Sequence, residues 1–523
     1  MNYDYALKWT DHDPDPVTAQ QVRDWIDADD TAALDAAFAG PLAFGTAGLR
    51  AAVGAGESRM NRAVVIRTTF GLISWLKQQT SEPVVVIGCD ARHGSAQFQR
   101  DAAEVISAAG GRALLLPAQN PTPLTAFAVK HYDADCGIMV TASHNPPADN
   151  GYKVYLGGRV ATGDAAGVQL VAPADAEIAA SIARAPFADE IARDDTRIED
   201  IDPRADYLNC AKALVGENTD LRIALTAMHG VGAALGAQLL SDAGFDTSLV
   251  PEQADPDPDF PTVSFPNPEE PGALDLGKAH AAKIDADILI AYDPDADRCA
   301  AAVPVGTAGD QKDFRQLSGD ETGALLGDYL ARRGATGTFA NSLVSSRLLG
   351  RIAKHYGLEH AETLTGFKWI ARTPNLSFGY EEAIGFCPDP QHVRDKDGIA
   401  TSLVLASLAA ECKAQGITLL DRLEDIYATV GRLATQPLTF RVEDLSIITN
   451  SMKKIRTTPP TTLAGEDVRA EEFEQGVKLY TKADDRVIVR PSGTEPKLKC
   501  YLESPDPARL DRIAADLREY FGI

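Results

Sequence analysis

Two short segments of the chain carry residue types suited to phosphoryl chemistry. Thr141-Ala-Ser-His-Asn-Pro146 offers one hydroxyl, that of Ser143, in a loop that ends in proline. Asp293-Pro-Asp-Ala-Asp-Arg298, about 150 residues further on, offers three carboxylates at alternate positions. Hard divalent cations such as Mg2+ take oxygen ligands and usually bind beside phosphate groups. A phosphorylated serine held against a metal on three aspartates would act as a phosphoryl relay.

The aspartate triplet does not fit a calcium loop, which needs Gly at its sixth and Glu at its twelfth position. Arg298 and Pro304 stand there instead. The apolar run Ile288-Leu-Ile-Ala-Tyr292 leads directly into the acids and predicts a buried strand. Open α/β sheets bind ligands at the carboxyl ends of their strands. A second acidic run, Asp255-Pro-Asp-Pro-Asp259, lies among prolines and is predicted to be a solvated turn.

The elements that must position these groups follow an alternating pattern. Apolar, β-branched runs at Val84–Gly88, Gly137–Val140 and Ile223–Thr226 alternate with Ala-rich helical stretches such as Ala233–Leu240. This alternation predicts βαβ units and a mostly parallel sheet. Further strands are expected at Arg486–Val489 and Leu498–Tyr501 in the last part of the chain, followed by a final helix.

A glycine cluster between one strand and the next helix imitates a dinucleotide-binding fingerprint. Gly230 and Gly232 are followed by Gly236, one residue later than the fingerprint requires. The nearest acidic residue, Glu252, follows a proline and does not end a clear strand. The sequence therefore disfavours nucleotide binding here.

Length and composition indicate a multidomain globular chain. A single core does not grow beyond ~250 to 300 residues, so 523 residues predict three or four domains. No segment reaches the ~18 uncharged apolar residues of a membrane span, and Met1-Asn-Tyr-Asp-Tyr5 does not begin a secretory signal. The seven cysteines, from Cys89 to Cys500, are odd in number and lack paired metal spacing. We expect a reduced, cytoplasmic setting.

The formal charge of −25 disfavours nucleic acid and anionic membranes as partners. A phosphorylated metabolite then requires a local cationic site. Two loops offer one: Phe44-Gly-Thr-Ala-Gly-Leu-Arg50, and Arg490-Pro-Ser-Gly-Thr-Glu-Pro-Lys497. Backbone N–H groups, hydroxyls and cations that converge on a tight glycine turn bind anions. The alternative for the second loop is a hairpin turn with incidental charge, whereas two anion sites would suit a doubly phosphorylated ligand.

Other candidate groups have ordinary alternatives. Glu381 and Glu382 lie between glycines and can accept hydrogen bonds from sugar hydroxyls, or lie in a solvated loop. Lys153 follows Ser143 by ten residues and is either an active-site ammonium or a surface charge. His144 is a natural base for Ser143, but adjacent residues seldom point toward each other, and no nucleophile elbow surrounds this serine. A serine-hydrolase triad is therefore disfavoured.

Taken in order, the Ser143 loop, the aspartate triplet, Gly379-Tyr-Glu-Glu-Ala-Ile-Gly385 and Arg490-Pro-Ser-Gly-Thr-Glu-Pro496 resemble the four signature loops of the α-D-phosphohexomutase superfamily. The glycine loop ending at Arg50, together with Thr365-Gly-Phe-Lys-Trp369, is most similar to the branch of phosphoglucomutase-2-type enzymes and phosphopentomutases.

The resemblance implies an α/β fold of four domains around a central cleft: three similar mixed-sheet α/β domains and a smaller α+β C-terminal domain. It places the phosphoserine loop in 1–204, the metal loop in 205–312, the sugar loop in 313–434 and the phosphate loop in 435–523.

The resemblance also implies roles for individual residues. Ser143 would be the phosphoserine and, with Asp293, Asp295 and Asp297, a Mg2+ ligand. The remaining implied site residues are catalytic Lys153, Arg50 and Arg298; sugar-binding Glu381, Glu382 and Lys368; and phosphate-binding Arg490, Ser492, Gly493, Thr494 and Lys497.

The implied activity interconverts the 1-phosphate and 6-phosphate of a hexose, glucose or mannose, through a phosphoserine and a hexose 1,6-bisphosphate. The sugar loop departs from the better-known hexose enzymes, because Ala383-Ile384-Gly385-Phe386 lacks their Ser and following His. A phosphopentomutase, a sugar-phosphate-binding protein without turnover and a metal-dependent phosphatase therefore remain alternatives. The sequence does not determine the oligomeric state.

Overall fold

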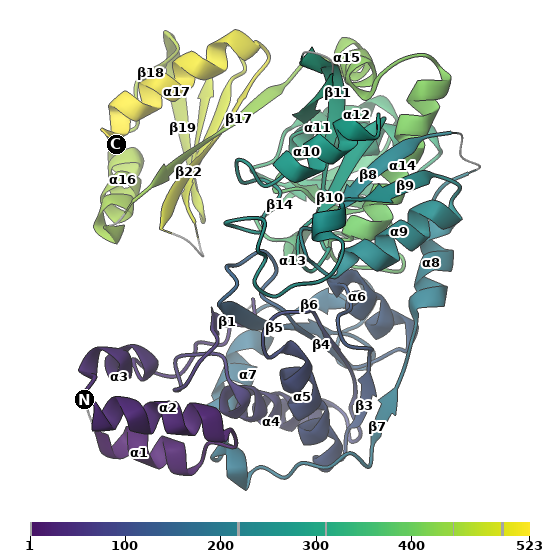
Figure 1. Ribbon diagram of the computed structural model, residues 1–523. Helices are drawn as coiled ribbons and strands as arrows, with labels where there is room; N and C mark the ends of the chain where they lie inside the picture. The colour runs from purple at the N-terminus through teal and green to yellow at the C-terminus, as the bar shows by residue number, and fades with distance from the viewer. Residues whose placement is uncertain are drawn as a thin grey trace.

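The computed structural model describes residues 3–45, 47–216, 220–308, 311–442, 444–492 and 496–522. The described chain folds into four units, each built on its own β-sheet and covered by helices (Figure 1). We name these units domains I to IV in chain order. Domain IV stands apart at the C-terminal, yellow end of the chain, and the first three helices form a separate layer at the purple end.

Domain I has seven strands in the order β1-β5-β4-β2-β3-β7, with β6 paired to β5. Its β2 pairs in parallel with both β3 and β4, whereas β5 runs antiparallel to β4 and β1. The elements are β1 (Leu49–Ala52), α4 (Arg62–Gln79), β2 (Val84–Cys89), α5 (Ser95–Ala108), β3 (Arg112–Leu115), α6 (Thr122–His131), β4 (Cys136–Val140), β5 (Asp149–Leu156), β6 (Val168–Gln169), α7 (Ala174–Ile182) and β7 (Ile198–Asp200).

Three helices precede domain I, and the sequence patterns above do not include them. They are α1 (Tyr3–Asp11), α2 (Pro16–Asp27) and α3 (Thr31–Ala37). Asp15 and Asp30 cap the last two, since each side chain accepts a hydrogen bond from a backbone N–H of the first turn.

Domains II and III are smaller mixed sheets. Domain II has the order β12-β11-β10-β8-β9 and domain III the order β14-β13-β15-β16. The elements of domain II, after the linking helix α8 (Arg204–Lys212), are β8 (Arg222–Thr226), α9 (Gly232–Asp242), β9 (Asp246–Leu249), α10 (Asp275–Lys283), β10 (Ile288–Tyr292), β11 (Cys299–Ala308) and β12 (Gln311–Gln316). Those of domain III are α11 (Gly319–Arg332), β13 (Thr338–Ser342), α12 (Leu348–His355), β14 (Glu359–Thr363), α13 (Phe367–Ile370), β15 (Leu376–Glu381), β16 (Gly385–Cys387), α14 (Gly398–Ala414) and α15 (Leu419–Val430).

Domain IV is an antiparallel sheet with two helices on one face (Figure 1). Its strand order is β17-β22-β21-β20-β19-β18. The elements are β17 (Ala434–Arg441), α16 (Leu445–Thr457), β18 (Thr462–Leu463), β19 (Glu466–Phe473), β20 (Gly476–Thr481), β21 (Arg486–Pro491), β22 (Lys497–Ser504) and α17 (Pro507–Phe521). Three mixed sheets followed by an α+β unit match the architecture that the sequence predicted.

The end of domain II lies further along the chain than the composition indicated. The charged stretch from Thr307 to Phe314 suggests a break between domains. In the structure β12 pairs antiparallel with β11, and the sheet of domain II continues to Gln316. The polar and charged residues of this stretch belong in part to the paired strands β11 and β12, so polarity alone misplaces the break.

The apolar core explains why domain IV stands apart. One cluster of buried side chains runs through domains I, II and III, including Val86, Leu225 and Leu403. Domain IV has its own cluster, and a small one, in which Leu343 and Val344 meet Ile488, joins it to domain III. Domains I to III therefore share a continuous core, and domain IV is attached through a limited contact.

All seven cysteines are free thiols, and six of them are buried. In the described part of the chain, no single helix is long and apolar enough to cross a membrane. The bent pair α14 and α15 passes on length and composition alone, and most of α14 is buried within the fold.

Candidate active site

The loop after β4 holds Ser143 in a left-handed conformation, with φ of 53°. Arg92, which follows β2 in the same sheet, fixes the backbone of this loop. Its guanidinium donates to the carbonyl oxygens of Ser143 (2.7 Å), Asn145 (2.5 Å), Pro146 (2.8 Å) and Asp149 (3.0 Å). Arg92 is buried, so these four bonds are shielded from water.

The aspartate loop begins where the buried strand β10 ends, as the sequence predicted. The carboxylates of Asp293, Asp295 and Asp297 are buried, and one oxygen from each lies within 4.8 Å of the others. Thr122, at the first turn of α6 in domain I, donates from Oγ1 to Asp295 Oδ2 at 2.6 Å and from its backbone N–H to Asp295 O at 2.9 Å. Domain I therefore helps to position the metal-type cluster of domain II.

Gly230, one of the fingerprint-like glycines of domain II, packs against the aspartate loop. A Cβ on Gly230 would lie 2.5 Å from Pro294 Cα, so the turn before α9 can approach the aspartate loop only without a side chain.

Ser143 and the aspartate cluster meet directly. Ser143 Oγ donates a hydrogen bond to Asp293 Oδ2 at 3.0 Å, although 150 residues separate them. Contrary to the sequence-based expectation, His144 Nδ1 also lies 3.2 Å from Ser143 Oγ, in a loop where Ser143 has a positive φ. Burial, and then the nearby Arg298, lowers the pKa of His144 well below its ordinary value.

Two buried lysines compensate the negative charge. Lys153, on β5, donates to Asp295 Oδ2 at 2.7 Å and to Asp297 Oδ2 at 2.9 Å. Lys396, from the loop before α14, lies 3.3 Å from Asp297 Oδ2. Burial lowers the pKa of Lys153, but the two aspartates outweigh it and the pKa is raised. Lys153 thus belongs to the centre and is not a surface charge.

The carboxylates respond unequally to this environment. Burial, together with the neighbouring Asp295 and Asp297, raises the pKa of Asp293 well above its ordinary value. Burial would also raise the pKa of Asp295, but Lys153 beside it outweighs burial and holds that pKa below its usual range. Crowded buried carboxylates repel one another unless a cation lies between them.

The donor set fits a hard divalent cation. Three carboxylates and one hydroxyl supply only oxygen, the ligand type that Mg2+ requires. Two buried oxygens, Asp295 Oδ1 and Asp297 Oδ1, have no hydrogen-bond partner among the residues that the structure describes. Unpaired buried acceptors are rare in proteins, and these two are available to a metal.

Two arginines of the predicted site lie beside the cluster. The backbone of Arg298 forms an antiparallel β-bridge with Gly385 of the sugar loop. The Nε of Arg298 lies 3.8 Å from Asp297 Oδ1. Arg50 lies on β1, opposite Gly151, and its buried Nε has no hydrogen-bond partner within the described part of the chain. Burial lowers the pKa of Arg50, while Asp295 and Asp297 act in the opposite direction.

The two glutamates of the sugar loop differ in environment. Glu381 is buried at the end of β15, and burial raises its pKa, opposed by Lys396 and Arg298. Glu382 is half-buried, and its Oε2 accepts hydrogen bonds from Ser342 (3.0 Å) and Ser345 (2.9 Å).

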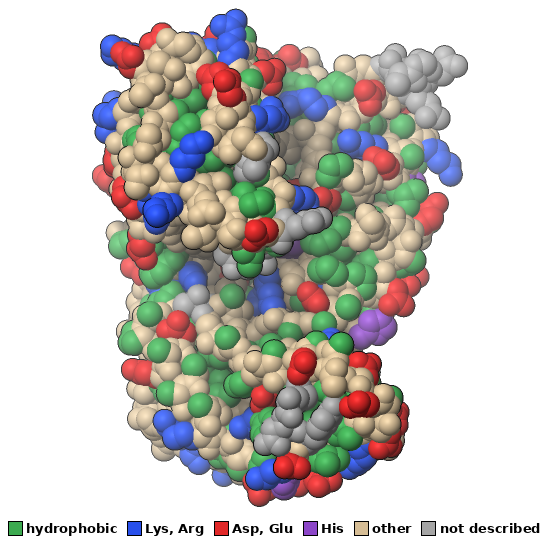
Figure 2. All heavy atoms as spheres, turned by 90° about the vertical axis from the view of Figure 1, so that its left-hand side faces the viewer, with side chains coloured by type: hydrophobic (Ala, Val, Ile, Leu, Met, Phe, Trp, Pro, Cys, Tyr) green, Lys and Arg blue, Asp and Glu red, His purple; other side chains and the backbone are tan. Residues whose placement is uncertain are grey.

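The remaining predicted residues lie further out. Lys368 is half-buried on α13, where burial lowers its pKa and Asp175 of domain I opposes that effect. Arg490, Ser492 and Lys497 lie at one end of the β21–β22 hairpin, whereas Gly493 and Thr494 lie outside the described residues. The space-filling view shows the face hollowed between the upper and lower parts of the molecule, with Lys and Arg side chains gathered in the hollow (Figure 2).

Sequence reasoning missed Arg92 and Lys396. For Arg92 a signal was present: Asp90-Ala-Arg92 follows the predicted strand at Val84 in the same way that Asp293 follows its own strand. Lys396 lies in the loop between β16 and α14, eleven residues after Gly385, and the fold brings it to Asp297 of domain II.

Comparison with known proteins agrees with this geometry. The profiles of the phosphoglucomutase/phosphomannomutase family match the chain four times: alpha/beta/alpha domain I at residues 41–188, domain II at 205–306, domain III at 318–430 and the C-terminal domain at 440–520. The chain therefore belongs to the phosphoglucomutase/phosphomannomutase family. It is an enzyme of the mutase class, an intramolecular phosphotransferase.

Among its relatives, the Haemophilus influenzae protein named "Probable phosphomannomutase" is 43% identical over 88% of this chain and 96% of its own length. The phosphopentomutase of Mus musculus is 34% identical over 99% and 94%. The phosphoglucomutase of Staphylococcus epidermidis is 34% identical over 88% and 90%.

Solved structures share the fold. The phosphoglucomutase pp63/parafusin of Paramecium, in its open form, superposes with a TM-score of 0.72 at 19% identity and covers 93% of this chain and 96% of its own. A family protein from Burkholderia thailandensis gives 0.71 at 20% identity, covering 90% and 95%.

Proposed function

We propose that the protein is a Mg2+-dependent hexose-phosphate mutase that interconverts the 1-phosphate and 6-phosphate of glucose or mannose through a phosphoserine at Ser143. The observation that carries this proposal is the 3.0 Å contact between Ser143 Oγ and the carboxylate of Asp293, within a buried triplet of acids. Mg2+, held by the triplet and a phosphoserine oxygen, would neutralise the charge of the transferring phosphoryl group.

The transfer conserves every atom. The Oγ–P bond of phosphorylated Ser143 breaks while a sugar hydroxyl oxygen bonds to the same phosphorus. The sugar hydroxyl loses its proton in this step, and Ser143 Oγ gains one in place of the phosphoryl group; the return step reverses both changes. The hexose 1,6-bisphosphate then presents its other phosphate, whose bond to the sugar breaks as Ser143 is phosphorylated again. Lys153 and Arg298 are two of the cations beside the aspartate triplet, and phosphoryl transfer depends mainly on such positioning and charge.

The other end of the ligand needs a second anion site. We assign it to Arg490, Ser492 and Lys497 in domain IV, together with the undescribed Gly493 and Thr494, and we assign the sugar-hydroxyl contacts to Glu382, with Glu381 and Lys368 nearby. Domain IV shares little core with the other domains. It can therefore move to hold either phosphate while the bisphosphate turns, and its closure would exclude water from the phosphoserine.

A direct assay tests the proposal. The protein with Mg2+, glucose 1-phosphate and a trace of glucose 1,6-bisphosphate should form glucose 6-phosphate, and Ser143→Ala should reduce the rate at least ~10^4-fold, since no covalent acceptor remains. Ser81→Ala, an exposed serine, serves as the matched control. A Ser143→Ala protein that turns over as fast as the parent refutes the phosphoserine.

A pentose substrate is the second candidate. Phosphopentomutases of mouse and human match 99% of this chain, and the sugar loop segment Ala383-Ile384-Gly385-Phe386 lacks the Ser and following His of the better-known hexose enzymes. Ribose 1-phosphate and mannose 1-phosphate belong in the same assay, and the substrate with the larger kcat/KM is the preferred one.

Two other outcomes would indicate a different function. Release of inorganic phosphate in step with substrate loss would indicate a phosphatase, and no covalent phosphate on the protein would indicate a binding protein. The free thiols support a reduced, cytoplasmic setting.

A further inference from the structure

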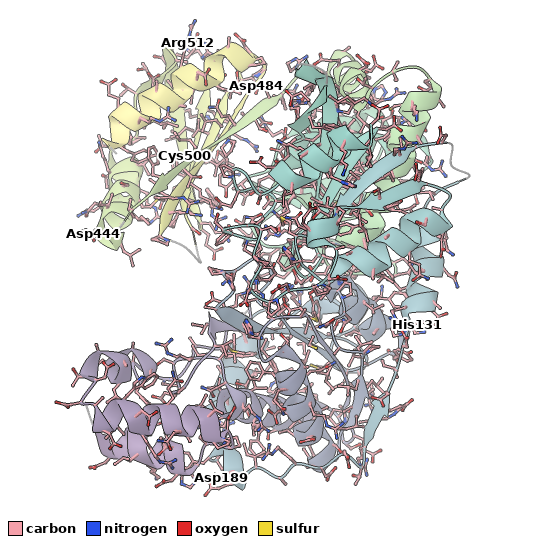
Figure 3. All side chains as sticks on the ribbon, in the orientation of Figure 1. His131, Asp189, Asp444, Asp484, Cys500 and Arg512 are labelled. Carbon is pink, nitrogen blue, oxygen red and sulfur yellow. The ribbon has the colours of Figure 1, made fainter. Side chains whose placement is uncertain are left out.

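Domain IV meets domain III along a buried, charged contact. Arg486 on β21 and Glu503 on β22 face each other in the register of the sheet, and both are at most 3% exposed. Glu503 Oε1 accepts from Ser346 Oγ and from the Arg347 backbone N–H, each at 2.9 Å, and Glu503 Oε2 accepts from Arg347 Nε at 2.8 Å. At the outer edge, Asp484 accepts from Arg347 Nη1 at 2.7 Å. Asp484 is labelled in Figure 3, on the side of domain IV that faces domain III.

The domain III partner in this contact is a single turn, residues 342–347, which we call the seam turn. Arg486 donates to two of its carbonyl oxygens, those of Leu343 at 3.2 Å and Ser345 at 2.5 Å. Leu343 packs on Ile488 of domain IV. Seating of domain IV therefore fixes the backbone of the seam turn through a buried guanidinium.

The same turn holds the sugar loop from its other side. Ser345 Oγ donates to Glu382 Oε2 at 2.9 Å and accepts from the Glu382 backbone N–H at 3.0 Å. Ser342 Oγ donates to the same oxygen at 3.0 Å. Among the described residues Glu382 Oε1 makes no hydrogen bond, so that oxygen is available to a ligand. Ser345 thus bonds to Arg486 through its carbonyl and to Glu382 through its hydroxyl.

We propose that Ser345 is a positioning residue that transmits the seating of domain IV to the carboxylate of Glu382, so that this carboxylate is held for a sugar hydroxyl only when the C-terminal domain is docked. The proposal rests on the proposed mutase function. When Arg486 withdraws, the carbonyls of the seam turn lose their donor, and the hydroxyl that orients Glu382 loses its support. Sugar recognition and closure over the phosphate would then occur together. Glu382 would not bind a sugar whose other phosphate is not held by domain IV.

The test compares substrates with and without the hydroxyl that Glu382 accepts. A panel of monodeoxy analogues of the best substrate identifies this hydroxyl. It is the one whose removal lowers kcat/KM most in the parent protein but does not lower it in Glu382→Gln. In Ser345→Ala that penalty should fall by ~10-fold or more, the effect of a lost hydrogen bond to a charged group. A purely structural defect would lower kcat/KM for all analogues equally, and this result overturns the proposal.

A double-mutant cycle adds a second readout. Arg486→Lys keeps the charge but loses the two-carbonyl fork, so it should reduce the same penalty. In the Ser345→Ala background, Arg486→Lys should have no further effect on that penalty, because the hydroxyl that couples the seam turn to Glu382 is absent. Additive effects contradict the coupling. If Ser345→Ala does not fold by circular dichroism, Arg347→Gln, which loosens the seam from the Glu503 side, takes its place with the same expectation.

The two proposals fail in different ways. If the parent protein forms no sugar-phosphate product and Ser143 is never phosphorylated, the mutase proposal falls and the coupling falls with it. If the parent turns over and Ser143→Ala does not, while Ser345→Ala keeps the full hydroxyl penalty, only the coupling is wrong.

Discussion

Ser143 Oγ lies 3.0 Å from Asp293 Oδ2, and this hydrogen bond joins a loop of domain I to a loop of domain II. Thr122 reinforces the junction by donating to Asp295 from both its hydroxyl and its backbone N–H. The reacting hydroxyl and the metal ligands thus come from separate sheets that share one apolar core. Mutations that affect the junction should therefore alter rate before they alter the fold of either domain.

Arg92→Met should lower kcat at least ~100-fold. Four carbonyl oxygens of the Ser143 loop lose their donor, and each buried hydrogen bond to a charged group contributes ~1.5–3 kcal/mol. Steady-state kinetics and the mass of the protein after treatment with glucose 1,6-bisphosphate measure the effect. Arg112→Met, which breaks an exposed ion pair with Glu199, is the control. Full phosphorylation and parent kcat in Arg92→Met would show that the loop does not need this clamp.

Mg2+ should stabilise the parent protein against heat, and EDTA should remove the effect. At a concentration 100 times Kd, binding adds ~2.7 kcal/mol to the free energy of unfolding. Asp295→Asn should lose the Mg2+-dependent shift in Tm, because it removes a ligand charge. Asp259→Asn, in the solvated acidic turn and 72% exposed, should keep it. Equal shifts in both variants would locate the metal elsewhere.

Stability should fall as pH rises from about 4 to 7, in part because of Asp320. Burial raises the pKa of Asp320 from 3.8 to about 7, helped by Glu382 and Glu503 and opposed by hydrogen bonds from the Ser346 N–H and the Tyr380 hydroxyl. The folded state then binds a proton that the unfolded state has released, so this contribution is present below pH 4 and is lost as pH passes 7.

Asp320→Asn should flatten that slope by up to ~1.4 kcal/mol per pH unit within the window. Urea unfolding at pH 5, 6, 7 and 8 measures it. Asp425→Asn, at a 64% exposed side chain, is the comparison. A slope that is identical in Asp320→Asn and in the parent would exclude Asp320 as its source.

Gly398→Ala should destabilise domain III and slow the reaction. A Cβ at Gly398 would lie 2.3 Å from the Arg298 carbonyl oxygen, so the helix α14 and the arginine loop must separate. Overpacking of this kind costs ~1–3 kcal/mol. Thermal unfolding and kcat are the measurements, with Gly216→Ala as the control because, among the described residues, its Cβ would meet an Arg333 side chain no closer than 3.5 Å. Parent-like kinetics in Gly398→Ala would show that Arg298 tolerates displacement.

The strands and the reacting groups could be predicted because their signals are local. The run Ile288–Tyr292 forms β10 with the predicted bounds, and the acids at its end form the cluster. Seven cysteines without disulfides also agree with the expectation. The roles of the site residues stay predictions, since they depend on a ligand.

Other features depend on tertiary contacts. The surface or interior position of Lys153 follows from the pairing of β5 between β4 and β1, which no local pattern specifies. The link from Arg486 to Glu382 crosses two domains through a turn whose sequence, Ser342-Leu-Val-Ser-Ser346, resembles an ordinary strand end. The helices α2 and α3 do carry a local signal, because Asp15 and Asp30 are capping residues at their N-termini.

The distribution of thiols gives the molecule a built-in set of unfolding reporters. Each of the four sheets carries at least one buried cysteine: Cys89 and Cys136 in domain I, Cys299 in domain II, Cys387 in domain III and Cys500 in domain IV. An alkylating reagent modifies such a sulfur only when its own sheet opens. Mass mapping of labelled peptides over time would then rank the local opening of the four domains without any engineered probe.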